Sequence, residues 1–96
     1  MLHPSVIPWF TPADWEKARA VHADPDSMGS SYDAWLKASE QAAKLMESPA
    51  VTVHKVYLNA DQLLAYAKRN NCAINADARV LCAIDVFLGP AFSQTI

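Results

Sequence analysis

Residues 51–58 read VTVHKVYL, the stretch of this chain with the strongest β-strand character. Its valines and its tyrosine favour extended structure, and Pro49 and Asn59 bound the run on its two sides. A strand carries rows of unpaired amide and carbonyl groups along its edges, so it requires a partner. Because the remaining segments have helical patterns, the identity of this partner decides the fold.

Two helices are predicted before the strand. In FTPADW at 10–15, Thr11 can cap a helix and Pro12 suits its first position, which predicts a helix over 12–23. A second helix begins in SSYD, with Ser30 as the expected cap, and apolar residues then recur at helical spacing as far as Met46.

Two more helices are predicted after the strand. NADQ at 59–62 has the spacing of a capping box, and the helix that follows ends at Asn70 or Asn71, which tolerate left-handed backbone. Asn75 caps a fourth helix, which continues to Leu88 and ends at a Gly-Pro pair.

The predicted fold is therefore α+β and mostly helical, in the order helix, helix, strand, helix, helix. A length of 96 residues suits one domain, expected over 1–96, with an N-terminal extended segment at 1–10 and a C-terminal tail at 89–96. Hydrophobic residues make up 52% of the chain, enough apolar surface to argue against disorder.

Three partners for the strand remain open: the same strand of a second subunit, SVIPWF at 5–10, or CAI at 72–74. Pro8 would confine SVIPWF to a sheet edge, and CAI is very short. We expect self-pairing across a two-fold axis, which makes the protein a homodimer. An antiparallel register centred on His54 avoids setting Lys55 against its own copy, and such an assembly should weaken below about pH 6 as the imidazoles become charged. The candidate interface residues are Val51, Val53, His54, Lys55, Val56, Tyr57 and Trp9.

Charge and hydropathy restrict the partners further. A formal net charge of -2 offers no general attraction to nucleic acid or to an anionic membrane. No apolar run approaches the roughly 20 residues that cross a bilayer, and MLHPSVIPWF at the N-terminus lacks the basic flank of a signal peptide. We therefore expect a cytoplasmic protein that binds neither nucleic acid nor membrane.

No catalytic or cofactor-binding residues can be assigned. The three histidines have no second ligand at metal-binding spacing, and Cys72 and Cys82 are expected to be two buried thiols. No serine, cysteine or threonine has the glycine-flanked setting of a nucleophile elbow, and Asp24 and Asp26 fit a solvated turn. We expect no metal and no cofactor, and the sequence leaves enzymatic activity open while favouring its absence.

The aromatic residues and the last helix bear on the mode of binding. Trp15 and Trp35 lie on apolar helix faces and are expected in the core, whereas Trp9 is expected to be partly exposed or packed on a partner. The last two helices could suggest a helix-turn-helix, but the second of them has Arg79 as its single basic residue. Phosphate contact normally requires several cations, which disfavours DNA binding.

SYDAWL at 31–36, VHKVYLNADQLLAY at 53–66 and NADARVLCA at 75–83 together resemble a pattern in small bacterial proteins of unknown function. In that pattern an aromatic-Asp-x-Trp-Leu helix start precedes a Val-rich strand and two further helices. The resemblance implies a bacterial cytoplasmic setting and no particular activity.

Three hypotheses for function follow. The first is a non-enzymatic protein that acts by self-assembly or by binding another protein. The second is a small-ligand binder or enzyme with a pocket of aromatic residues and a histidine, which a deep pocket around His54 or Trp9 with convergent polar groups would favour, whereas a flat apolar patch shared by two subunits would favour the first. The third, which the single basic residue of the last helix disfavours, is a DNA-binding regulator.

Overall fold

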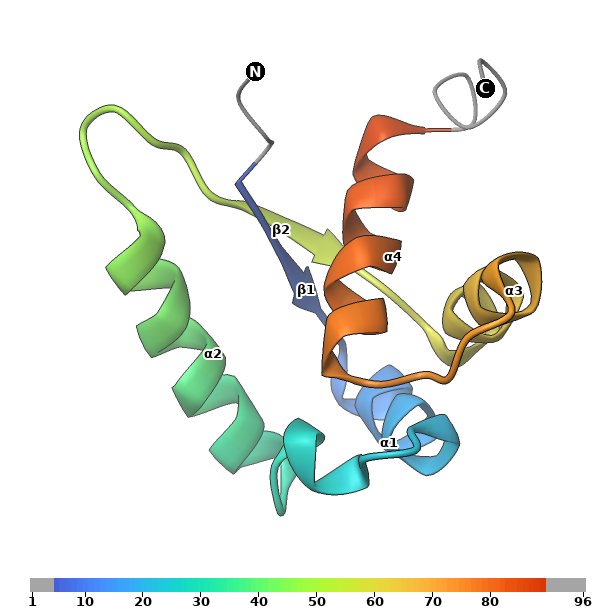
Figure 1. Ribbon diagram of the computed structural model, residues 1–96. Helices are drawn as coiled ribbons and strands as arrows, with labels where there is room; N and C mark the ends of the chain where they lie inside the picture. The colour runs from blue at the N-terminus through green and yellow to red at the C-terminus, as the bar shows by residue number, and fades with distance from the viewer. Residues whose placement is uncertain (1–4, 90–96) are drawn as a thin grey trace.

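The predicted strand has a partner in the same chain. In the computed structural model, which describes residues 5–89, strand β2 (His54–Tyr57) lies parallel to strand β1 (Val6–Trp9) (Figure 1). SVIPWF, one of the three candidate partners, therefore supplies the strand that pairs along one edge of β2, which leaves the other edge of β2 for any pairing with a second subunit. The sequence also predicted a longer strand than the four residues of β2.

Pro8 lies at the outer edge of the strand pair, as predicted. The β2 amides of His54 and Leu58 donate to the carbonyl oxygens of Ser5 and Trp9, at 2.8 and 2.9 Å. Backbone groups of alternate residues point to opposite sides of a strand, so the missing N–H of Pro8 falls on the side of β1 away from β2. Proline therefore removes a donor from the free edge of β1 without weakening the pair.

The four predicted helices are present, and the fold is α+β and mostly helical as expected. Their bounds are α1 (Pro12–Val21), α2 (Tyr32–Met46), α3 (Ala60–Asn70) and α4 (Ala76–Leu88). The predicted order omitted β1 and a short 3₁₀ helix, η1 (Pro25–Met28). Residues 90–96 of the predicted tail lie outside the described residues.

Local capping explains where the helices begin. The side chains of Thr11, Asn59 and Asn75 each accept a hydrogen bond from a backbone amide three residues on, as predicted. The second helix is capped by Ser31 rather than by the predicted Ser30, because the Ser31 hydroxyl reaches the amide of the third residue after it at 3.1 Å. Asn71 closes α3 in the left-handed conformation, with φ of 50°.

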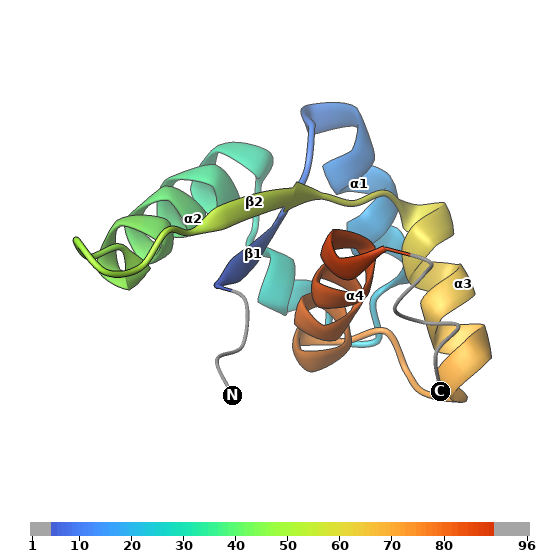
Figure 2. The same cartoon turned by 90° about the horizontal axis from the view of Figure 1, so that it is seen from above.

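Helices α2 and α4 lie on opposite sides of the strand pair (Figures 1 and 2). On the α4 side, the ring of His54 stacks on Phe87 with centroids 4.7 Å apart. On the α2 side, Trp9 meets Trp35 edge to face at 5.3 Å. The strands therefore form the middle layer of the molecule.

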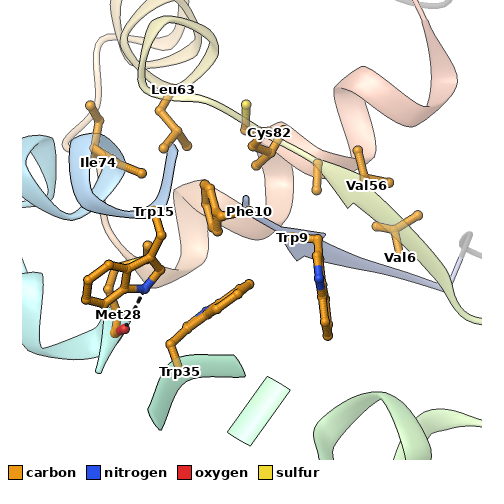
Figure 3. Close-up of a cluster of buried hydrophobic side chains, with 13 residues drawn as sticks. Val6, Trp9, Phe10, Trp15, Met28, Trp35, Val56, Leu63, Ile74 and Cys82 are labelled. Atoms are coloured by element: carbon orange, nitrogen blue, oxygen red, sulfur yellow. Dashed lines mark hydrogen bonds between the residues drawn. The ribbon is translucent and has the colours of Figure 1, made fainter. Parts of the chain in front are cut away.

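The core lies where β1 enters α1. Phe10 is fully buried and meets Trp35 edge to face at 5.5 Å, while the indole N–H of Trp15 donates to the carbonyl oxygen of Met28 at 3.0 Å (Figure 3). Thirteen buried side chains form this cluster: Val6, Trp9, Phe10, Trp15, Ala18, Met28, Trp35, Val56, Leu58, Leu63, Ile74, Cys82 and Ala83. Trp15 and Trp35 belong to the core as predicted.

Candidate functional site

The predicted interface residues do not share one surface. His54, Lys55 and Tyr57 are exposed, and Tyr57 retains 58% of its surface. Val51 is also exposed, in an isolated bridge before β2, and Val53 is half-buried. Two residues of the set, Val56 and Trp9, are buried in the core.

Trp9 is 4% exposed, so the prediction that it is partly exposed is wrong. Its ring packs on Trp35 at one side, and the Lys55 ammonium lies 4.3 Å from its centroid at another. Pairing of SVIPWF with β2, one of the three alternatives left open by the sequence, brings Trp9 into the core. The indole therefore contributes to folding, and Lys55 covers it from solvent.

The outer edge of β2 presents free backbone groups. Since the amides of His54 and Leu58 point to β1, those of Lys55 and Tyr57 point the other way. Within residues 5–89, no backbone hydrogen bond reaches these two amides from another element. One edge of the strand pair is thus interrupted by proline and the other is open to a further strand.

Helix α4 carries an apolar stripe on its exposed side. Val80, Leu81, Ile84, Phe87 and Leu88 form this stripe, which is called the α4 stripe below, while Val86 is also exposed but lies on another side of the helix. Leu81 is 52% exposed, and Ile84 is half-buried. The spacing i, i+1, i+4, i+7, i+8 places the five on one side of the helix, opposite buried Ala78 and Cys82. From Val80 to Leu88 the helix carries apolar residues on most of its sides, with Asp85 as the one charged residue, a signal that could have revealed this surface.

Polar residues join α4 to α1 at the other end of the helix. His22 is 6% exposed, its Nδ1 lies 2.6 Å from the carbonyl oxygen of Ala18, and its Nε2 lies 3.0 Å from Nη1 of Arg79. Arg79 also donates to the hydroxyl of Ser27 at 3.1 Å. Asp24, expected in a solvated turn, accepts a hydrogen bond from the amide of Ala76 at 3.2 Å instead.

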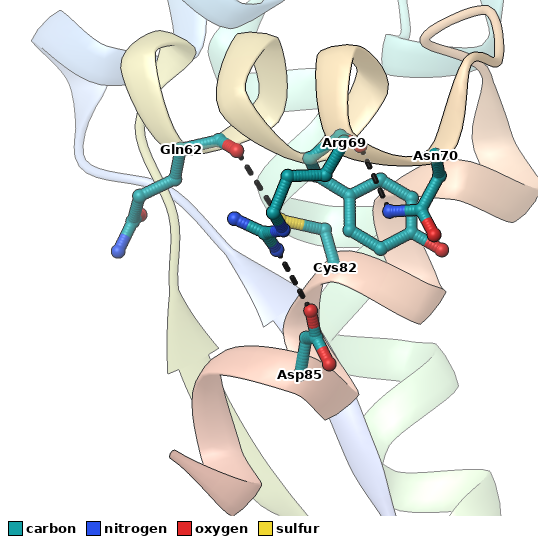
Figure 4. Close-up of polar contacts among 6 residues, drawn as sticks. Gln62, Arg69, Asn70, Cys82 and Asp85 are labelled. Carbon is teal, nitrogen blue, oxygen red and sulfur yellow. Dashed lines mark hydrogen bonds and ion pairs between the residues drawn. The ribbon is translucent and has the colours of Figure 1, made fainter. Parts of the chain in front are cut away.

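A second polar group connects α3 and α4 (Figure 4). Arg69 pairs with Asp85 at 2.9 Å, and the Asn70 side chain donates to the carbonyl oxygen of Tyr66. The thiol of Cys82 donates to the carbonyl oxygen of Gln62 at 3.7 Å. The Arg69–Asp85 and Cys82–Gln62 contacts join α3 to α4, whereas the Asn70–Tyr66 contact lies within α3.

The two cysteines differ, which corrects the expectation of two buried thiols. Cys82 is buried, and that burial raises its pKa to about 11, whereas Cys72 is exposed. We predict that iodoacetamide at about pH 8 alkylates Cys72 alone in the folded protein, because the thiolate is the reactive form. Intact mass should show one adduct without denaturant and two in concentrated urea. Two adducts on the folded protein would contradict the burial of Cys82.

Other classes of site find little support in the described residues. Within residues 5–89, no group of three or more His, Cys, Asp or Glu side chains is arranged to hold a metal ion. No helix in the same part of the chain has the length and apolar character to cross a membrane. A shallow depression beside Trp15 and Arg19, and another beside Lys44 and Val51, are open to solvent and include neither His54 nor Trp9.

Comparison of the chain with protein-family models, with curated proteins and with solved structures finds no match. The function therefore has to be argued from the surfaces of this chain.

Proposed function

We propose that this protein acts by self-association, as a non-enzymatic homodimer whose interface includes the α4 stripe and the adjoining outer edge of β2. The observation that carries the proposal is the stripe itself. An apolar helix face is normally buried, yet within residues 5–89 the main packing partners of α4 are the two strands and α3, and Leu81 stays 52% exposed. The uncovered side is available for a second copy.

The α4 stripe suits two-fold symmetry. If two copies of α4 pack antiparallel about an axis beside Ile84, Val80 lies opposite Leu88 of the second copy, and Leu81 lies opposite Phe87. Each stripe residue then meets an apolar residue, as an isologous interface requires. No charged side chain is among the five, so the stripe itself brings no charge into the contact.

The outer edge of β2 adjoins the stripe through the stacked rings of His54 and Phe87. An antiparallel pairing of two β2 edges would use the amides of Lys55 and Tyr57 that point away from β1. In the His54-centred register, the two His54 residues would form a pair without ladder hydrogen bonds, flanked by hydrogen-bonded pairs of Val53 with Lys55. The edge and the stripe can therefore belong to one continuous interface.

Other functions fit these surfaces less well. Arg79, the basic residue of α4, donates to Ser27 and faces His22, so its guanidinium is already used within the fold. This use further weakens the DNA-binding hypothesis, because a recognition helix needs cations free to meet phosphates. No specific observation favours the small-ligand hypothesis over self-association.

The test is the solution mass of substituted chains. We predict that the unmodified protein has twice the chain mass by light scattering at micromolar concentration, and that Leu81→Glu lowers it to one chain. A carboxylate buried in an apolar contact costs several kcal/mol, which weakens dimerisation on the order of 100-fold. Leu45→Glu is the matched control, because Leu45 is 87% exposed on α2, away from the stripe.

A Lys55→Pro variant tests the strand edge separately. Proline at this position removes an outward-pointing donor and no hydrogen bond of the β1–β2 pair. Dimers that survive Lys55→Pro but not Leu81→Glu would restrict the interface to the stripe. A strictly monomeric unmodified protein at micromolar concentration would refute self-association.

A further inference from the structure

We propose that His22, Arg79 and Asp24 form an acid-sensitive latch, in which protonation of His22 releases residues 22–29 from the first turn of α4. The latch is independent of self-association. It rests on two observations. The imidazole of His22 is nearly fully buried with a polar contact at each ring nitrogen, and residues 23–29 contact α1 and the start of α4 through different groups.

The contacts of His22 require a neutral ring. Its Nδ1 lies 2.6 Å from the carbonyl oxygen of Ala18, an acceptor, so Nδ1 carries the proton. Its Nε2 lies 3.0 Å from Nη1 of Arg79, which is always a donor, so Nε2 must offer its lone pair. A proton added to Nε2 would remove this hydrogen bond and place an imidazolium directly against a guanidinium.

Two charged groups face the imidazole from neighbouring elements. Arg79 approaches from α4 and disfavours the charged ring, while Asp24 approaches from the loop after α1 and favours it. Burial has the largest effect, and together these influences lower the pKa of His22 below its ordinary value of 6.5. The folded state therefore resists protonation that the unfolded chain accepts.

The consequence for stability has a definite sign. Below about pH 6.5 the unfolded chain binds a proton at His22 more readily than the folded chain does, so acid lowers the free energy of unfolding. Above that pH both states are neutral at this position, and its contribution no longer changes with pH. Protonation of His22 therefore destabilises the contact between its Nε2 and Nη1 of Arg79.

The segment after His22 is attached to two helices by different groups. Its contacts with the α4 end are those of Ala23, whose amide donates to the carbonyl oxygen of Ile74 at 2.8 Å, of Asp24 and of Ser27. Its contacts with α1 are made by three other residues, since Trp15 donates to the carbonyl oxygen of Met28, and Arg19 donates to that of Gly29 and pairs with Asp26 at 3.6 Å. Protonation strains the first set and leaves the second intact.

Asp24 shows that the α4 side is incompletely satisfied even at neutral pH. One carboxylate oxygen accepts the amide of Ala76, and the other is buried with no hydrogen-bond partner. A buried acceptor without a donor is unfavourable and gains solvation when the segment opens. The opened state therefore recovers part of the free energy that is lost with the Arg79 contacts.

Amide hydrogen exchange tests the latch. Protection factors, corrected for intrinsic rates, are measured at about pH 7.5 and about pH 5.5. The amide of Ala23 reports the contact with the α4 end, and the amide of Leu58, which bonds Trp9, reports the strand pair. We expect protection at Ala23 to fall several-fold at the lower pH while protection at Leu58 is retained.

Two variants test whether His22 or His54 causes the pH dependence at Ala23, and an NMR titration measures the protonation of His22 directly. His22→Gln should abolish the pH dependence at Ala23, and His54→Gln should preserve it. The NMR titration of the His22 ring in the unmodified protein should have its midpoint below 6.5. The proposal is overturned if Ala23 protection is independent of pH, if it falls equally at Leu58, or if its loss persists in His22→Gln.

Discussion

Phe10→Ala is expected to lower the free energy of unfolding by about 3–5 kcal/mol, because removing a buried aromatic ring loses its transfer free energy and leaves a cavity. Phe10 is fully buried, meets Trp35 at 5.5 Å and joins β1 to α1 in the middle of the core. A domain of this size has a total stability of about 5–15 kcal/mol. The substitution should therefore remove a large part of the total free energy of unfolding.

Urea denaturation followed by far-ultraviolet circular dichroism measures the effect. Leu45→Ala serves as the control, because it removes apolar atoms from a side chain that is already 87% exposed, and its expected cost is within about 0.5 kcal/mol. Similar midpoints for Phe10→Ala and Leu45→Ala would show that the N-terminal segment is not part of the cooperative core.

The helices could be predicted from the sequence because their signals are local. Thr11, Asn59 and Asn75 each act on an amide three residues away, and Asn71 ends α3 through its own backbone conformation. Such interactions depend on a few neighbouring residues and little on the remaining fold. The displacement of one cap from Ser30 to Ser31 is within the usual uncertainty at helix ends.

The partner of β2 could not be predicted in the same way. SVIPWF was among the open alternatives, but four residues containing a proline have weak strand character on their own. Their pairing with β2 is stabilised by packing, since Val6 and Trp9 place their side chains in the core on either side of the sheet. The choice of strand partner thus depends on tertiary contacts that periodicity does not encode.

The candidate surfaces also depend partly on local sequence and partly on tertiary contacts. The apolar character of α4 can be read directly in its sequence, although which side remains exposed depends on where the strands lie. The His22 and Arg79 contact joins residues 57 positions apart, and neither residue type suggests the other. Asp85, which shares α4 with Arg79, pairs with Arg69 of α3 at 2.9 Å, a contact between residues 16 positions apart.

Arg79→Ala is expected to lower the free energy of unfolding at neutral pH by about 2–3 kcal/mol, since charged hydrogen bonds are lost and a buried acceptor is left unsatisfied. Its guanidinium meets the Ser27 hydroxyl at 3.1 Å and Nε2 of His22 at 3.0 Å. Burial lowers the pKa of Arg79, while Asp24 partly opposes this shift. Water can replace the contact with the exposed Ser27 hydroxyl but not the contact with Nε2 of His22, because the imidazole is buried.

Arg69→Ala is the matched control, because it removes an arginine whose contacts are exposed, whereas Arg79 contacts a buried imidazole. Arg69 pairs with Asp85 at 2.9 Å, a shorter contact than any made by Arg79, but the Arg69 side chain is 59% exposed. An exposed ion pair contributes about 0–1 kcal/mol, because water solvates both partners almost as well when they separate. Equal losses for the two variants in urea denaturation would contradict a buried role for Arg79. A larger loss for Arg79→Ala would show that this arginine stabilises the fold mainly by satisfying polar groups that water cannot reach.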